Sequence, residues 1–207
     1  MCIRDSRRSA PRSAQKNTLV PLAEDSDLPL AGMLVIDLGI FTAGSVTSTL
    51  LADLGARVIK IESESYSDPF RIWPGIKGDS PLFTFNNRNK LGVNIDLKTD
   101  AGKVTFLELV ARADIVVENF RRGVLERLGI DFPVLKSANP NIILASVSGQ
   151  GASGPGSGHV SFGSTLEAIG GVAALTGYKD GPCYISCLLY TSPSPRDATL
   201  SRMPSSA

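Results

Sequence analysis

Short apolar runs alternate with amphipathic stretches between residues 33 and 147, and this alternation constrains the fold more than any other feature. Five runs have the length and β-branched content of buried strands: 33–36, 58–61, 93–95, 115–117 and 142–147. Strands that alternate with helices favour a parallel sheet with right-handed crossovers. The sequence therefore predicts an α/β fold: an incomplete, Rossmann-like parallel sheet with helices on both faces.

The helices between these strands are predicted from residues spaced to share one face. The first expected face consists of Val46, Leu50, Leu51 and Leu54, with Gly55 as the terminating cap. Thr99 can cap a second helix, whose expected face consists of Val104, Leu107, Val110 and Ala111. Three further helices are expected at 124–128, after Asp131 and at 163–175.

Two segments lack any apolar period and are predicted as loops. Residues 63–81 contain Pro, Gly and Trp73, the only tryptophan, for which packing and covering a substrate are both open roles. Residues 149–158 are rich in glycine, and composition fits either a gate over a site or a plain flexible connection.

The strand at 115–117 ends in residues that suit a phosphate-bearing nucleotide. Glu118 and Asn119 follow it, Phe120 offers a flat aromatic surface, and arginines come next, at 121, 122 and 127. Arginine binds phosphate through a planar fork of donors, and such ligands bind outside the carboxyl ends of parallel strands. A solvated arginine pair on an ordinary turn is the alternative that these residues leave open.

Known nucleotide motifs do not fit the first turn. Residues 39–45 read G-x-x-x-x-G-S and lack the lysine of a phosphate-binding loop, and no G-x-G-x-x-G occupies this first turn. We therefore expect Gly44 to permit a close approach of the backbone to a ligand or to a strand.

Composition excludes several classes of function. The net charge is +1, which predicts no nucleic-acid partner, and no apolar run approaches the roughly 20 residues of a membrane span. The three cysteines, Cys2, Cys183 and Cys187, all lie outside residues 28–182. A disulfide within that body is therefore impossible, and we expect a cytoplasmic protein without a metal site.

The two ends share an unusual relationship. Residues 1–5 can be encoded ATG TGT ATA AGA GAC. Followed by AG, the reverse complement reads TGT CTC TTA TAC ACA, which encodes residues 187–191. We interpret both ends as translated sequencing adapter, so that residues 1–6 and 187–207 should pack against nothing. Residues 1–27 are then an adapter-derived start with a disordered arm, 28–182 the native body, and 183–207 junction and adapter.

Residues 113–130, ADIVVENFRRGVLERLGI, resemble the central signature of the class III CoA-transferases, a family that includes formyl-CoA transferase and carnitine CoA-transferase. Similar pieces follow in family order: 29–32, 35–37, 43–44, 51–56 with 58–62, 86–90, 96–99, 139–140, 145–149, 175–177 and 180–182. The resemblance covers 28–182, which would be the N-terminal part of the large domain and less than half of a typical member.

The resemblance implies a site for coenzyme A, the family's acyl-carrying substrate. Charge for its phosphates would come from Lys98, Arg121 and Arg127, and Phe120 or the backbone around Ile95 to Leu97 would flank the adenine. Thr42 and Ala43 match positions that line the family's CoA site, and Asn119 belongs to the same signature. Ser63 stands where some members carry an arginine, so one phosphate contact is expected to be missing. These expectations name Thr42, Ala43, Ile95, Leu97, Lys98, Asn119, Phe120, Arg121 and Arg127.

The family's chemistry implies an aspartyl nucleophile and a carboxylic acid as the second substrate. That Asp follows a Gly-Pro-Pro, whereas this chain reads Asp180-Gly-Pro-Cys183 and then enters the expected adapter. No catalytic residue is therefore expected within 28–182, and the truncated chain should be inactive. Members also form interlocked homodimers, so the full-length protein is expected to do the same.

Two alternatives to a transferase stay open. The first is a non-catalytic CoA-binding half, as in fused or degenerate members. The second is a 2-methylacyl-CoA racemase of the same fold, which uses a His and an Asp. The racemase motif would place its His at Phe162, whereas the only histidine is His159, followed by Val160. His159 is therefore interpreted as an ordinary loop residue.

Overall fold

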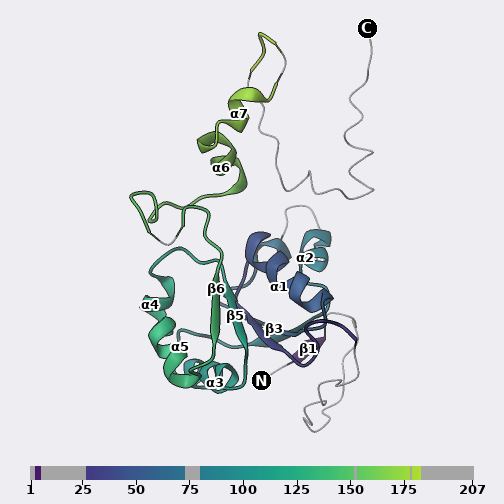
Figure 1. Cartoon of the computed structure of the whole chain (residues 1–207), viewed down its shortest axis with the longest axis vertical. Coiled ribbons are helices and arrows are strands. Elements are labelled where there is room, and N and C mark those ends of the chain that lie inside the picture. Colours follow the sequence, from purple (N-terminus) through teal and green to yellow (C-terminus); the bar gives the residue numbers. More distant parts are fainter. Residues whose placement is uncertain (1–2, 6–26, 73–79, 152, 178, 183–207) are drawn as a thin grey trace. The chain divides into compact units, whose positions relative to one another are not determined.

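The computed structural model describes residues 3–5, 27–72, 80–151, 153–177 and 179–182 (Figure 1). The chain divides into two units, Met1–Ser148 and Gly149–Ala207. The first unit holds the sheet and the helices α1 to α5 that flank it. The division falls where the glycine-rich segment begins.

Five parallel strands form the sheet, as the sequence predicts. They are β2 (Leu34–Asp37), β3 (Arg57–Glu62), β4 (Lys90–Asn94), β5 (Ile115–Glu118) and β6 (Ile143–Ser146). With the antiparallel β1 (Ile3–Asp5) the order is β1-β4-β3-β2-β5-β6. Ile36 of β2 pairs with Ile59 of β3 on one side and with Val116 of β5 on the other. The strand at 115–117 is therefore interior, as expected.

The helices begin where capping residues stand. In the first unit they are α1 (Ala43–Asp53), the 3-10 turn η1 (Pro69–Arg71), α2 (Pro81–Asn86), α3 (Asp100–Val110), α4 (Val124–Leu128) and α5 (Phe132–Ala138). The Thr99 hydroxyl accepts the N–H of Gly102 at 3.0 Å, which confirms the predicted cap of α3. Asp131 caps α5 in the same way, and Ser80 caps α2.

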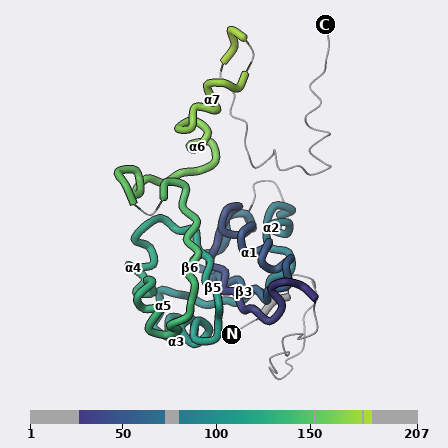
Figure 2. The backbone as a smooth tube through the Cα atoms, viewed as in Figure 1, coloured from purple at the N-terminus to yellow at the C-terminus, as the bar shows by residue number. Residues whose placement is uncertain are grey.

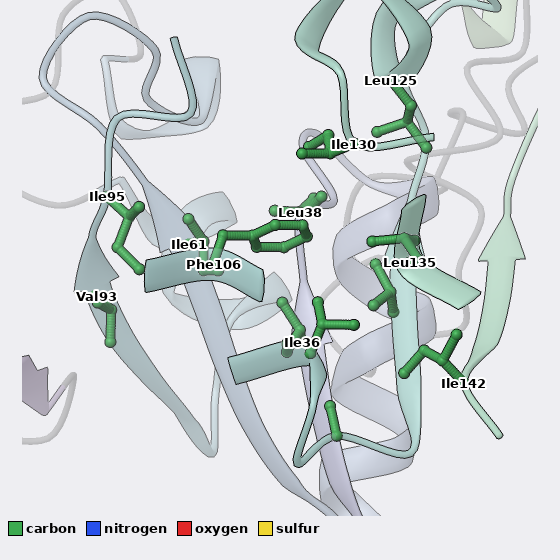
Figure 3. Packing of buried hydrophobic residues seen from close by; sticks show 13 residues of the cluster. Ile36, Leu38, Ile61, Val93, Ile95, Phe106, Leu125, Ile130, Leu135 and Ile142 are labelled. Carbon is green, nitrogen blue, oxygen red and sulfur yellow. The ribbon is translucent and has the colours of Figure 1, made fainter. Parts of the chain in front are cut away.

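Both faces of the sheet are covered, because consecutive strand residues point to opposite sides. Ile36 belongs to the larger apolar cluster, which α3, α4 and α5 cover with Phe106, Val110, Leu125 and Leu135 (Figure 3). Its neighbour Val35 belongs to a second cluster with Val58 and Val117, which Leu51 and Ala52 of α1 cover. The predicted fold, a Rossmann-like parallel sheet with helices on both faces, is confirmed (Figure 1).

The predicted apolar face of α1 is wrong in part: Leu51 packs against the second cluster, but Leu50 and Leu54 do not. Leu50 and Leu54 are 54% and 45% exposed, whereas the helix buries small residues, namely Gly44, Ser45, Ser48 and Thr49. The buried hydroxyls bond to carbonyls one turn back in the same helix: Thr49 donates to Ser45 O at 2.8 Å and Ser48 to Gly44 O at 3.2 Å. These bonds satisfy the hydroxyls, so the helix can bury them at little cost.

The predicted face of α3 is displaced in a similar way. Val104 is 58% exposed, while Phe106 is completely buried together with the correctly predicted Val110. Phe106 lies within the larger cluster in Figure 3, where it meets side chains from the sheet. A large aromatic side chain gains more from burial than a valine does, and it therefore sets the rotation of the helix.

Two segments differ in detail from their predictions. The helix expected at 163–175 is two helices in the second unit, α6 (Gly163–Ile169) and α7 (Val172–Leu175). The break falls at Gly170 and Gly171, where Gly171 has φ +76°. The predicted loop 63–81 contains the short η1, and α2 begins at its end; Trp73 lies outside the described residues.

The expectation that residues 1–6 pack against nothing is wrong for Ile3–Asp5. This segment forms β1 and pairs with β4, with Ile3 opposite Val93 and Asp5 opposite Leu91. The physical reason is the edge of the sheet, where β4 presents unpaired backbone groups to any extended segment. Residues 187–207 lie outside the part of the chain that the structure describes.

Candidate functional site

The direction in which the chain builds the sheet reverses between β2 and β5. From β2 the chain adds β3 and β4 on one side, then returns to add β5 and β6 on the other. Figure 2 follows this path from the blue β3 to the teal β5 and green β6. The loops after β2 and β5 therefore leave in opposite directions, and we call the point where they part, at the carboxyl ends of the two strands, the crevice between β2 and β5. Parallel α/β sheets bind their ligands at such a point.

Asn119 joins the two sides of this crevice. Its Nδ2 donates to Ile40 O at 2.9 Å, and its Oδ1 accepts the Ile40 N–H at 2.8 Å. A Cβ on Gly44 would lie 2.6 Å from Asn119 Oδ1, so glycine is required there. The expected close approach at Gly44 is thus to the residue that follows β5. The amide of Asn119 is used to fix the β2–α1 loop, which comprises residues 38–42.

Four charged side chains lie buried behind this loop. Lys90 Nζ donates to Asp37 Oδ2 at 2.8 Å, to Ser45 O at 2.7 Å and to Asn87 Oδ1 at 3.0 Å. Lys60 Nζ donates to Gly39 O at 2.5 Å and lies 3.5 Å from Asp68 Oδ2 and 3.8 Å from Asp37 Oδ2. We call Asp37, Lys60, Asp68 and Lys90 the buried charge cluster; all four are nearly inaccessible to solvent.

The buried charge cluster is electrically balanced, with two ammonium and two carboxylate groups. Burial lowers the pKa of Lys90 to about 8; Asp37 opposes this shift, and Lys60 adds to it. Lys90 therefore keeps its proton at neutral pH. Buried charges are tolerated only when their hydrogen bonds are satisfied, as here. The cluster consequently locks β2, β3 and β4 to the first turn of α1.

The buried charge cluster was missed by sequence reasoning. The available signal was Lys60, a lysine inside an otherwise apolar strand, because a charge at such a position needs a partner. Which groups would meet could not be inferred, since Lys60 and Lys90 lie 23 and 53 residues along the chain from Asp37, which both of them approach.

A second ion pair fixes the loop after β3. Arg71 binds Glu62 through Nε at 2.9 Å and through Nη2 at 2.6 Å, while the guanidinium lies 3.7 Å from the ring centre of Phe83. Burial raises the pKa of Glu62, but the hydrogen bonds from Arg71 and from the Asp68 N–H, with the charges of Lys60 and Arg71, leave it below its usual value. Glu62 is therefore ionised at neutral pH.

The structure places every predicted CoA-binding residue at the carboxyl edge of the sheet or on the helices that leave it. Thr42 precedes α1 without a side-chain capping bond, and Ala43 begins the helix. Asn119, Phe120 and Arg121 follow β5, Arg127 lies on α4, and Ile95, Leu97 and Lys98 follow β4. The three basic residues are exposed. The predicted residues thus come from the ends of β2, β5 and β4, of which β2 and β5 are neighbours and β4 is separated from β2 by β3.

Individual roles within this set differ. The Ile95 side chain is only 6% exposed and belongs to the core, and its N–H already donates to Glu62 O at 2.8 Å. The Phe120 ring packs edge-on against Tyr66, with 5.8 Å between ring centres. Tyr66, from the loop after β3, was not predicted. Arg127 lies beside Gly123, where a built Cβ would be 3.7 Å from Nη1.

Glu118 does not have the surroundings of a nucleophile. Its side chain is 6% exposed, and Oε2 accepts the Phe120 N–H at 2.7 Å. Through this bond Glu118 holds the loop that follows β5. In the second unit, His159 is exposed and its backbone N–H donates to Gly156 O at 2.9 Å, as in a turn. Glu167, in that same unit, is buried on α6.

A hollow of about 350 Å³ lies at the opposite, amino edge of the sheet. Its polar groups serve the backbone: Asp114 Oδ2 accepts the Leu34 N–H at 2.7 Å, and Asn139 Nδ2 donates to Ala113 O at 2.7 Å. Arg112 also lines it. We assign no ligand to this hollow, because parallel sheets bind at the carboxyl edge.

Within the described residues, no group of three or more His, Cys, Asp or Glu side chains is placed to hold a metal ion. Of the helices described, none has the length and apolar character needed to cross a bilayer.

Comparisons with known proteins agree with this geometry. The sequence profile of CoA-transferase family III matches residues 30–192, which extends past Pro182. An acetyl-CoA:oxalate CoA-transferase of Acetobacter aceti is 41% identical over 155 residues, 74% of this chain and 40% of the relative. A succinyl-CoA–D-citramalate CoA-transferase of Chloroflexus aurantiacus is 42% identical over 156 residues, 74% of this chain and 39% of the relative.

Solved structures show the same relationship. The crystal structure of a CAIB/BAIF family protein from Brucella suis has a TM-score of 0.73 and 34% identity, covering 80% of this chain and 45% of that one. A hypothetical protein from Mycobacterium tuberculosis has a TM-score of 0.69 and 34% identity over 76% of this chain. The chain spans about two fifths of the length of the curated relatives it matches. By sequence and by fold, the chain belongs to CoA-transferase family III.

Proposed function

We propose that the gene for this chain encodes a CoA-transferase that moves CoA between an acyl-CoA and a carboxylic acid. The observation that carries the proposal is the pair of Asn119–Ile40 hydrogen bonds, which joins the loop that leads to Thr42 and Ala43 to the segment that follows β5, between the adjacent strands β2 and β5. Relatives whose names state this reaction are about 40% identical over the same residues.

Binding of CoA at this edge would use the exposed basic residues for its phosphates. Lys98, Arg121 and Arg127 come from the ends of β4 and β5 and from α4, so they can surround an extended ligand. Arginine forms paired hydrogen bonds to phosphate, whereas lysine acts as a point charge. The partly buried Phe120 and Leu97 provide apolar surface next to these charges, which suits the adenine ring.

The proposed chemistry proceeds through an aspartyl enzyme. A carboxylate oxygen attacks the thioester carbon, the C–S bond breaks, and CoA leaves as a thiolate, forming a mixed anhydride. The thiolate then attacks the aspartyl carbonyl, releasing the first acid and leaving CoA on the enzyme as a thioester. The second acid reverses these steps and leaves as its CoA thioester.

The nucleophile of this reaction is proposed to lie beyond Pro182 in the intact gene. Glu118 holds the loop after β5, and Glu167 lies in the second unit on the helix that follows the glycine-rich segment. We propose that the gene continues with another proline and then an Asp followed by small residues. The truncated chain would bind CoA at best and would not transfer it.

The test uses the protein encoded by the intact gene. The protein is incubated with an acyl-CoA and trapped with hydroxylamine, and the hydroxamate is located by mass spectrometry. Modification of the predicted Asp, together with loss of transfer when that Asp is replaced by Asn, is the expected result. A hydroxamate on Glu118 or Glu167 would refute the mechanism. Absence of any Asp in that stretch would favour the alternative, a non-catalytic CoA-binding half.

Assembly and location complete the proposal. We propose an interlocked homodimer in the cytoplasm for the full-length protein, with no nucleic-acid, membrane or metal partner. The cytoplasmic location is supported by the absence of cysteines between residues 28 and 182. Sedimentation of the full-length protein as a monomer would contradict the dimer. A racemase, the third choice, predicts α-proton exchange with deuterium oxide without any acid acceptor.

A further inference from the structure

Phe41, the residue before Thr42, has an unusual backbone conformation. Its φ is +55°, in the left-handed region that glycine enters freely and that a bulky L-residue rarely adopts. Such a conformation persists only when the surrounding structure enforces it, and it is often found at functional sites. The surroundings of Phe41 therefore identify what holds the β2–α1 loop in place.

Asp68 is the group that enforces this conformation. Its Oδ1 accepts the Phe41 N–H at 3.3 Å and the Phe70 N–H at 3.0 Å, and its Oδ2 accepts the Ser45 hydroxyl at 3.3 Å. The carboxylate is completely buried, and Lys60 lies 3.5 Å from it. The ring of Phe41 also packs edge-on against the ring of Phe70 in the turn η1, with 5.4 Å between ring centres.

We propose that Asp68 is a positioning residue: it holds Phe41 in the left-handed conformation and thereby fixes Thr42 and Ala43 at the crevice between β2 and β5. This inference rests on the proposed CoA site. The Asp68 carboxylate caps the turn η1 and also binds the loop and the first turn of α1, through Phe41 and Ser45, which lie 27 and 23 residues earlier in the chain. Asp68 itself need not touch the ligand.

If Asp68 only supported the fold, its loss would destabilise the whole sheet and not the β2–α1 loop in particular. Neither apolar cluster contains Asp68, and the sheet is held by its own strand pairing. Because Asp68 also belongs to the buried charge cluster, its loss should lower the global stability as well. We expect the β2–α1 loop to be disturbed first, since the strand pairing does not involve the Asp68 side chain. When only a fraction of the molecules has the binding-competent loop, the apparent affinity falls by that fraction.

The first experiment replaces Asp68 by Asn in the protein from the intact gene. We expect CoA affinity, measured by calorimetry, to fall about tenfold, because the acceptor of the Phe41 and Phe70 N–H groups loses its charge and the oxygen that accepts the Ser45 hydroxyl becomes an amide donor. Amide hydrogen exchange at residues 40–43 should become faster, while exchange in β2 and β5 stays slow. Asp53→Asn is the matched control, because Asp53 pairs with Arg88 on the surface and should leave both readouts unchanged.

The second experiment compares two substitutions at position 41. Both Phe41→Ala and Phe41→Gly remove the ring contact, but only glycine adopts a positive φ freely. With Asp68 present, the two variants should bind CoA nearly equally. In the Asp68→Asn background, the Ala variant should bind about fivefold more weakly than the Gly variant, since the left-handed conformation is then no longer enforced.

The results separate this inference from the proposed function. If the wild type binds no CoA, the proposed function is wrong, and exchange at residues 40–43 still decides whether Asp68 holds the loop. Unchanged exchange in Asp68→Asn would overturn the inference. So would equal affinities of the Ala and Gly variants in that background. If Asp68→Asn fails to fold, the fold rather than the loop depends on Asp68, which also overturns the inference.

Discussion

The side-chain amide of Asn119 bonds to both backbone polar groups of Ile40, at 2.8 Å to the N–H and 2.9 Å to the carbonyl. These bonds join β5 to the loop after β2 across 79 residues of sequence. The Asn119 amide thus binds the N–H and the C=O of one residue, as the backbone of a neighbouring strand does in a β-sheet. Asn119 therefore works as a brace for the crevice rather than as an exposed group that awaits a ligand.

Asn119→Ala should open this crevice. Loss of both bonds leaves the backbone groups of Ile40 without these partners, which should lower the free energy of unfolding by about 1–3 kcal/mol. CoA affinity should fall as well. Urea unfolding and calorimetry give the two values. Asn141→Ala, an exposed asparagine near the opposite edge, is the control and should change neither.

Arg127→Ala should weaken CoA binding by about 1.5–3 kcal/mol, the range for hydrogen bonds to a charged group. Arg112→Ala removes the same charge from the hollow at the amino edge of the sheet and should have little effect. Calorimetry on the full-length protein measures both. Equal losses for the two variants would show that long-range charge, rather than a local contact, governs binding.

Acid should abolish the contribution of Glu62 to stability. Its pKa in the folded protein lies below the ordinary value, so the stabilisation is present at neutral pH and is lost as pH falls through the folded pKa. Glu62→Gln should lower the free energy of unfolding by about 1–2 kcal/mol at pH 7, allowing for the partly exposed Arg71. At the acid end the variant and the wild type should converge; a constant difference would disprove the linkage.

Alkaline pH should have the opposite effect through Lys90. Its folded pKa of about 8 lies below the ordinary value of 10.5, so the folded protein releases this proton first. Between these values the unfolded chain holds more protons, and the contribution of Lys90 to stability rises with pH. The free energy of unfolding of the wild type should therefore rise relative to Lys90→Gln between pH 8 and 10, and a fall would contradict the assignment.

Two positions on α3 test the corrected helix face. Phe106→Ala should cost about 3–5 kcal/mol, because it empties a completely buried site. Val104→Ala should cost no more than about 0.5 kcal/mol, as for an exposed position. Chemical denaturation of both variants gives the comparison. A large loss at Val104 would restore the face that the sequence pattern predicted.

The positions of the strands along the chain were predictable because β-branched runs such as Ile115–Val117 have few alternatives to a buried strand. Helix rotation was not, because Thr49 and Ser48 become buried only by bonding to their own helix, which hydropathy does not reveal. The same holds for Asp68, whose partners lie on other elements. For the site, the signature predicted Asn119 and Arg127 at one edge, whereas the bracing role of Asn119 depends on the position of Ile40.

The central position of β2 affects how the chain can fold. Most strands pair with the strand that precedes them in the sequence: β3 with β2, β4 with β3, and β6 with β5. Among the five parallel strands, β5 alone joins a distant one, β2, and the Leu34–Asp114 bond between their amino ends closes 80 residues of chain. Loop closure of this length is the entropically slow step. A growing chain on the ribosome could thus complete a three-stranded layer before the residues that finish the crevice are synthesised.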